Sequence, residues 1–429
     1  MAAKAFNHAL YMKLYDHAQD LFSSAFRRGS KSVEIVQAIL ILTYWKEPQD
    51  TRVWTSIGYA IRICMDLGWH KLAYSRSEAV TPDSEVQRRE RRNVERTWYV
   101  LFVYDRSISL QTGRPWMIEC SEFIESIEDW CDDPLTIEND QLLGAFTTLR
   151  LVTSSAFPLL VTKSRQQSMS HSESAPLVSL LDGRIERWEK KWTEQITAQT
   201  EQSCHEFLIR FYGTHLRLQL HTLPLHGILV SEKTNINHHI DTVWVAYSSA
   251  LNMLQLISRF SEHVCFAQDS IHVMTAYSAA FLVKITLVFS DFISVQLESP
   301  CIEAIQQAAQ VFSNQSGCIS SSCTLQASFL ERVAIKLVEN QTRHKTPKES
   351  EPAGVEGPVS HTIDQLDMNG GPSADSEGSS SSRRPPDLAT LDISFLAQEN
   401  LDFPFECDDM WAEMFGMNPQ DVSFFPQTD

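Results

Sequence analysis

Chain-breaking residues are distributed unevenly along this sequence of 429 residues. Residues 1–340 contain only 9 Gly and 8 Pro, whereas residues 341–429 contain 6 Gly and 9 Pro. Glycine and proline average about 7% and 5% of residues in proteins, and an all-β chain needs many of both for its turns. The first 340 residues are therefore expected to form an all-α, multi-helix domain that is large enough for a substantial core.

Apolar residues in this part of the chain recur at helical spacing. In residues 51–68 they are separated by three and four positions, which places them on one face of a helix, and Gly68 follows where a left-handed cap ends it. Residues 86–111 begin charged, become apolar, and are followed by Gly113 and Pro115, which stop a helix. Further helices are expected at 32–45, 138–160, 174–199, 203–230, 237–261, 267–295, 300–312 and 322–340.

Composition divides the remaining residues into two segments. Residues 341–386 contain no aromatic residue, and a segment of this kind cannot bury enough apolar surface to offset its chain entropy, so we expect a disordered linker. Residues 387–429 contain 10 acidic residues, seven aromatic residues and no Lys or Arg. The sequence thus predicts a helical regulatory domain (1–340), a linker (341–386) and an acidic-aromatic activation segment (387–429).

Charge and cysteine usage exclude several classes of protein. The net charge of −18 argues against a surface that coats nucleic acid or anionic membrane. No apolar run reaches the roughly 18 residues that a membrane span needs, and the N-terminus lacks the apolar stretch of a secretory signal. The nine cysteines are scattered, with no Cys-x-x-Cys pair, so neither a disulfide framework nor a zinc ribbon is indicated. The expectation is an intracellular protein without a membrane segment.

Two blocks of sequence carry a resemblance to a known family. The first, 33–70, contains the pattern Trp, Gly-x-Ala-Ile-Arg and Asp-Leu-Gly-x-His; the second, 90–106, contains Glu-Arg-Arg, Trp and Tyr-Asp-Arg and is followed by Gly-Arg-Pro at 113–115. Over residues 30–120 the chain resembles the middle homology region of fungal binuclear zinc cluster (Zn2Cys6) transcription factors. The resemblance implies an all-helical regulatory domain, a location in the nucleus and control of RNA polymerase II genes.

The zinc cluster through which that family binds DNA is missing from the sequence. Such a cluster needs six closely spaced cysteines, because two zinc ions share their thiolates, and the first cysteine here is Cys64. Either the chain is a fragment, or it is a regulator without its own DNA-binding domain. No cofactor is therefore expected in this chain, and DNA contact is expected only indirectly or through a missing N-terminal module. A homodimer or a heterodimer stays open.

The acidic tail holds the candidate binding residues. Asp408 or Asp409 can cap a short helix that Gly416 ends, with apolar side chains on one face. A helix this short is unstable alone, so we expect it to form in the groove of a coactivator or mediator protein. The candidate coactivator-binding residues are Phe403, Phe405, Met410, Trp411, Met414 and Phe415. The alternative is a C-terminal element that docks onto the chain's own core.

Charged residues before and after the second block have structural explanations. The arginines of 88–92, together with Arg96, resemble an import signal or a phosphate contact, but the glutamates between them favour ion pairs on a solvated helix. The pairs Asp105-Arg106 and Arg62 with Asp66 either line a pocket or pair with each other between helices, and the second is favoured. The tryptophans at 54, 98 and 116 are interpreted as packing residues.

Neither a metal site nor a catalytic site is predicted. The histidines of the central region do not recur on one helical turn; they are His205, His215, His221, His226, His238 and His239. No nucleophile-elbow, zincin, dinucleotide or P-loop pattern is present. Two alternatives to a transcription regulator remain: an all-α biosynthetic enzyme that holds Mg²⁺ and diphosphate at the carboxylates of 129–133, and a non-catalytic scaffold.

Overall fold

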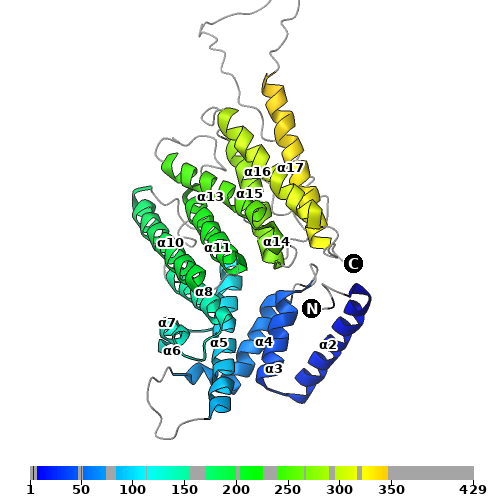
Figure 1. The fold of residues 1–429 in the computed structure, drawn as a ribbon, viewed down its shortest axis with the longest axis vertical. Helices are drawn as coiled ribbons and strands as arrows, with labels where there is room; N and C mark the ends of the chain where they lie inside the picture. Colours follow the sequence, from blue (N-terminus) through cyan, green and yellow to red (C-terminus); the bar gives the residue numbers. More distant parts are fainter. Residues whose placement is uncertain are drawn as a thin grey trace, which may run out of the picture. The chain divides into compact units, whose positions relative to one another are not determined.

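A computed structural model describes a large part of the chain (Figure 1). The described residues are 3, 7–46, 50, 52–73, 84–112, 114–154, 171–199, 203–225, 240–264, 267–288, 295–315 and 321–345. They form fourteen α-helices and two 3-10 turns, and no strand occurs among them. The all-α fold class is therefore confirmed for this part of the chain.

Most of the helices lie where the apolar spacing predicts them. The α-helices are α2 (His8–Arg28), α3 (Val33–Tyr44), α4 (Val53–Asp66), α5 (Glu85–Thr112), α6 (Glu122–Glu125), α7 (Ile127–Cys131), α8 (Glu138–Ser154), α10 (His171–Gln199), α11 (Ser203–Thr222), α13 (Ile240–Arg259), α14 (Ser261–Val264), α15 (Asp269–Val288), α16 (Val295–Asn314) and α17 (Ser321–Lys345). The 3-10 turns are η1 (Trp69–Lys71) and η2 (Leu223–Leu225). Helices α2, α6, α7 and α14 were not predicted.

Local signals account for the ends of the first helices. The Ser32 hydroxyl accepts a hydrogen bond from the Ile35 N–H at the start of α3, which satisfies a backbone donor that has no partner inside the helix. After α4, Gly68 adopts a left-handed conformation (φ 81°) and its N–H donates to the Met65 carbonyl. The predicted stop at Gly68 is confirmed, whereas Gly113 lies outside the described residues.

Consecutive helices pack on one another through the domain. Helix α3 packs on α4, α4 on α5, α5 on α8, α8 on α10, α10 on α11, α11 on α13, and α13 on α15 and α16. A core of buried aliphatic and aromatic side chains runs from α3 to α11, and its largest members include Trp130, Trp192, Tyr99 and Phe102. This succession brings α3, α5, α8 and α11 around a common space.

A charge cluster joins α5 to α8 and corrects the interpretation of the basic run. Arg89 pairs with Glu85 one turn away, as expected (2.8 Å), but Arg92 is only 5% exposed and pairs with the fully buried Asp140 (3.1 Å). Arg96 Nη2 donates to the same carboxylate at 2.9 Å. The expectation of a solvated helix was wrong for these two arginines, because α8 covers that face of α5.

The acid–base pairs predicted at 62–66 and 105–106 have other partners. Asp66 pairs with Lys31 (2.7 Å), and Arg62 donates to the Gly58 carbonyl. Asp105 Oδ2 accepts two backbone N–H groups, from Met117 and Ile118, at 2.8 Å each. That carboxylate therefore anchors the segment after α5 to the helix, and mutual pairing was the wrong expectation for Arg62 and Asp66.

The three tryptophans have different environments, and only one is fully enclosed. Trp98 is buried, and Trp54 packs on the core while Arg114 lies over its ring. Trp116 is more than one-third exposed and stacks under Arg106. These positions agree with packing at the core and at its edge.

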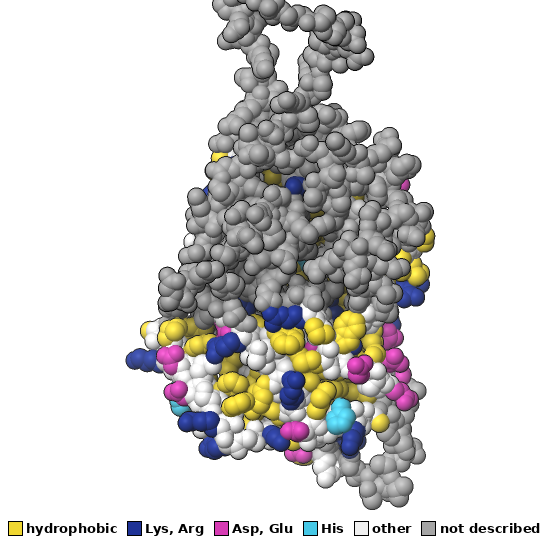
Figure 2. All heavy atoms as spheres, turned by 180° about the vertical axis from the view of Figure 1, so that it is seen from behind, with side chains coloured by type: hydrophobic (Ala, Val, Ile, Leu, Met, Phe, Trp, Pro, Cys, Tyr) yellow, Lys and Arg dark blue, Asp and Glu magenta, His cyan; other side chains and the backbone are white. Residues whose placement is uncertain are grey.

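The described surface does not present a continuous basic face in the view of Figure 2. Lys and Arg side chains lie scattered there among acidic and apolar ones, whereas nucleic-acid binding requires clustered cations. Several apolar side chains of α2 are about half exposed: Leu10, Met12, Leu14, Leu21 and Phe26. None of the helices in the described part of the chain has the length and hydropathy needed to cross a membrane.

Candidate functional site

The predicted coactivator-binding residues lie outside the residues that the structure describes. They are Phe403, Phe405, Met410, Trp411, Met414 and Phe415. The linker from 346 to 386 lies outside them as well, and residues 341–345 form the end of α17. The interpretation of the tail therefore stays a prediction.

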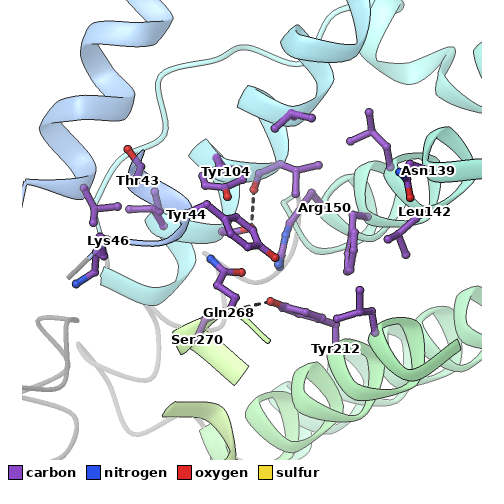
Figure 3. Close-up of a pocket in the computed structure, with 18 residues that line it drawn as sticks. Thr43, Tyr44, Lys46, Tyr104, Asn139, Leu142, Arg150, Tyr212, Gln268 and Ser270 are labelled. Carbon is purple, nitrogen blue, oxygen red and sulfur yellow. Dashed lines mark hydrogen bonds between the residues drawn. The ribbon is translucent and has the colours of Figure 1, made fainter. Parts of the chain in front are cut away.

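The helical domain contains a cavity of about 270 Å³ (Figure 3). It lies between α3, α5, α8 and α11, and the N-terminal end of α15 closes one side. Its lining residues are Thr43, Tyr44, Lys46, Val53, Val100, Val103, Tyr104, Ser107, Ile108, Asn139, Leu142, Leu143, Phe146, Arg150, Leu208, Tyr212, Gln268 and Ser270. Two of these are cationic and none is acidic, so the lining carries net positive charge.

Arg150 is the buried cation of the cavity. Its side chain points from α8 into the space between the helices (Figure 3), and it is only 4% exposed. Burial lowers its pKa to about 10, so the guanidinium is still protonated at neutral pH. Its Nε has no hydrogen-bond partner, and no ion pair holds the guanidinium within the described part of the chain. A buried charge without a counter-charge is costly.

Tyrosines from three helices surround the same space. Tyr44 of α3 and Tyr104 of α5 lie with ring centroids 5.8 Å apart, and the Tyr212 hydroxyl of α11 is 3.3 Å from Ser270 Oγ. Burial raises the pKa of all three phenols, and their mutual proximity raises the pKa of Tyr44 and Tyr104 further. They are therefore neutral groups at physiological pH that can donate a hydrogen bond.

His215 lies one turn beyond Tyr212 on α11 and is also uncharged. Burial, and then the nearby charge of Arg150, lower its pKa to about 3. Its Nδ1 has no hydrogen-bond partner, and the ring meets Tyr277 edge-on. Among the described residues, neither His215 nor the three tyrosines of the cavity supplies a negative charge beside Arg150 at neutral pH.

The remaining histidines of the central region make separate polar contacts. His205 Nε2 is 3.1 Å from Asn139 Oδ1, and His221 Nε2 is 3.2 Å from Asp182. Positions 226, 238 and 239 lie outside the described residues. Among the residues with described positions, no three His, Cys, Asp or Glu side chains gather as a metal ion would require.

Within the acidic cluster at 129–133, Asp133 has a structural role. Asp133 Oδ1 accepts the Leu135 N–H at 2.7 Å and lies 3.9 Å from Arg92. That carboxylate stabilises the turn after α7 and supports the charge cluster between α5 and α8. It does not face the cavity.

The sequence interpretation did not identify Arg150 or the tyrosines around it. The available signal was a charged residue inside an apolar stretch, Leu149-Arg150-Leu151. The pocket was instead considered at Asp105-Arg106, neither of which lines the cavity.

Comparisons with known proteins agree on one family. Residues 3–190 match the family model described as "Fungal specific transcription factor domain". "Protein priB" of Lentinula edodes is 29% identical over 256 residues, which are 58% of this chain and 43% of that protein. The "Transcriptional activator of proteases prtT" of Emericella nidulans is 22% identical over 289 residues, 64% of this chain and 41% of that protein.

A third similar protein matches a shorter part of the chain. The "Acetamidase regulatory protein" of Aspergillus fumigatus is 31% identical over 141 residues, 32% of this chain and 16% of that protein. The matched region spans about two fifths of the length of the first two relatives. No solved structure matches the chain.

Proposed function

Because residues 3–190 are a fungal specific transcription factor domain, the middle homology region of the Zn2Cys6 regulators, we propose that this chain regulates transcription by RNA polymerase II in the nucleus. The family consists of transcription factors and not of enzymes, and one similar protein is a transcriptional activator by name. The all-helical architecture and the family match over 3–190 are the observations that support this proposal.

The activating element in this proposal is the acidic-aromatic segment 387–429. Its 10 acidic residues keep seven aromatic side chains in water without a basic residue nearby. A partner with an apolar groove and a basic rim would fold the segment and bury one aromatic face. The helical domain would control that segment, and DNA would be reached through a partner protein or through a zinc cluster outside this sequence.

A reporter assay tests the activating element directly. Residues 387–429, fused to an unrelated DNA-binding module, are expected to activate a reporter gene. Replacing Trp411 and Phe415 together by Ala should abolish the output, because both lie on the proposed helix face. The matched control replaces Phe424 and Phe425, which lie outside that face, and should keep most of the activity. A scramble that preserves charge and stays fully active would refute binding through a helix face.

A further inference from the structure

We propose that the cavity between α3, α5, α8 and α11 binds a small organic monocarboxylate, with the carboxylate paired to Arg150 and the apolar body enclosed by α5 and α8. The proposal concerns only the helical domain, so its test is independent of the test of the activating segment 387–429. Three properties of the cavity support it. Arg150 is buried without an ion pair among the described residues, the other cation of the lining acts on an aspartate of the chain, and the apolar wall encloses a limited volume.

The first property is the cation. Arg150 is buried, points into the cavity and has neither an ion pair nor a partner for its Nε. The other two buried arginines have different surroundings: Arg92 pairs with Asp140, whereas Arg106 has no ion pair within the described residues but lies over the rings of Phe102 and Trp116 outside the cavity. A bound carboxylate would give Arg150 the bidentate partner that the guanidinium geometry favours.

The second property is the number of free charges. Lys46 is the other cation of the lining, and its charge acts on Asp50, whose pKa it helps to lower. One guanidinium is thus left for the ligand. A phosphate dianion would keep a buried excess of negative charge here, whereas a monocarboxylate is neutralised by Arg150. Neutral phenols of Tyr44 and Tyr212 are available as further hydrogen-bond donors.

The third property is the apolar wall. Two valines of α5 and three apolar side chains of α8 line the cavity: Val100, Val103, Leu142, Leu143 and Phe146. Its volume of about 270 Å³ exceeds the roughly 150 Å³ of an apolar cavity that takes up benzene, and it falls just under the usual range for drug-sized ligands, which starts near 300 Å³. One ring with a short acid chain, or a branched aliphatic acid, matches this space.

Calorimetric titration of the purified full chain tests the proposal. The probes are benzoate, 3-phenylpropanoate and 4-methylpentanoate, each compared at pH 7 with its uncharged amide. At least one acid should bind with a 1:1 stoichiometry, and its amide should bind at least about tenfold more weakly, because a hydrogen-bonded charge contributes about 1.5–3 kcal/mol. No heat of binding for any acid up to about 10 mM would overturn the proposal, as would equal affinities for acid and amide.

Two variants locate the site. Arg150→Met keeps an unbranched side chain and removes the charge, so it should lose the preference for acid over amide. Without ligand its melting temperature should stay equal or rise, because an unpaired buried charge is removed. Val103→Phe leaves the charge and fills the apolar part, so it should weaken acid and amide alike. Arg187→Met removes an exposed arginine of α10 and should bind as the parent does. Unchanged binding in Arg150→Met, or a large drop in its melting temperature, would contradict the assignment.

Discussion

His215 makes the stability of the helical domain depend on pH with a predictable sign. Its side chain is 6% exposed, and burial together with Arg150 lowers its pKa from the ordinary 6.5 to about 3. The unfolded chain therefore binds a proton at this position at a higher pH than the folded chain does. The contribution is complete above pH 6.5 and is lost as the pH falls from 6.5 towards 3.

The magnitude follows from proton linkage. Each pH unit inside that window costs up to about 1.4 kcal/mol of unfolding free energy for one proton, so the loss between pH 7 and pH 5 is about 2 kcal/mol. This figure changes little if the folded pKa is 2 or 4, because the unfolded state alone titrates between pH 7 and 5. The full loss near pH 3 would be about 5 kcal/mol.

Urea unfolding followed by tryptophan fluorescence at pH 7, 6 and 5 measures this loss. His215→Gln and His215→Phe differ in size and polarity, but neither replacement titrates. Both are expected to flatten the profile by about 2 kcal/mol relative to the parent chain, whatever their stability at pH 7. Parallel profiles for parent and variants would refute the burial of a neutral histidine beside Arg150.

Three further predictions concern packing and buried polar groups in the described domain. Asp140→Asn removes the buried carboxylate of Arg92, which then has only the more distant Asp133, and urea unfolding should report a loss of about 3–5 kcal/mol. Gly144→Ala places a Cβ 2.6 Å from Cys131 Sγ and should lower the unfolding free energy by about 1–3 kcal/mol. The matched change Gly183→Ala adds a Cβ with nothing within 4 Å and should raise that free energy by about 0.5–1 kcal/mol. Thermal denaturation measures both. Asp105→Ala removes the acceptor of the Met117 and Ile118 N–H groups and should lower the unfolding free energy by about 2 kcal/mol. Limited proteolysis should then cut the chain at 114–118, because this segment is no longer anchored to α5.

The sequence predicted helix positions well because those depend on local signals. The apolar spacing in α4 and the glycine after it describe a helix and its stop without reference to any other part of the chain. Helix α2 was not predicted, although the apolar side chains of its less exposed face recur at steps of four and three: Tyr11, Tyr15, Ala18, Phe22 and Ala25. Leu10, Leu14 and Leu21 beside that face are about half exposed, so the apolar stripe in the sequence is wider than the buried one.

The sequence did not predict which charged faces would be covered. Arg92 and Arg96 share a helix face, and periodicity can show that much; whether α8 covers the face depends on a contact across more than forty residues. The cavity was even harder to predict from the sequence, because its lining residues range from Thr43 to Ser270. No spacing rule brings Tyr44, Arg150 and Tyr212 together, because only the packing of α3, α8 and α11 does so.

The balance of buried charge explains why Arg150 has no carboxylate partner among the described residues. Although the chain as a whole is acidic, with a net charge of −18, the described interior holds more cations than carboxylates. The buried charged residues are Lys46, Arg92, Arg106, Arg150 and Lys284 against Asp105 and Asp140. Asp140 serves two arginines, and Asp105 Oδ2 is occupied by two backbone N–H groups. Neither carboxylate is left for Arg150. Within the described residues no carboxylate pairs with Arg150, whereas Arg92 has Asp140, and a bound carboxylate would supply the counter-charge that Arg150 lacks there.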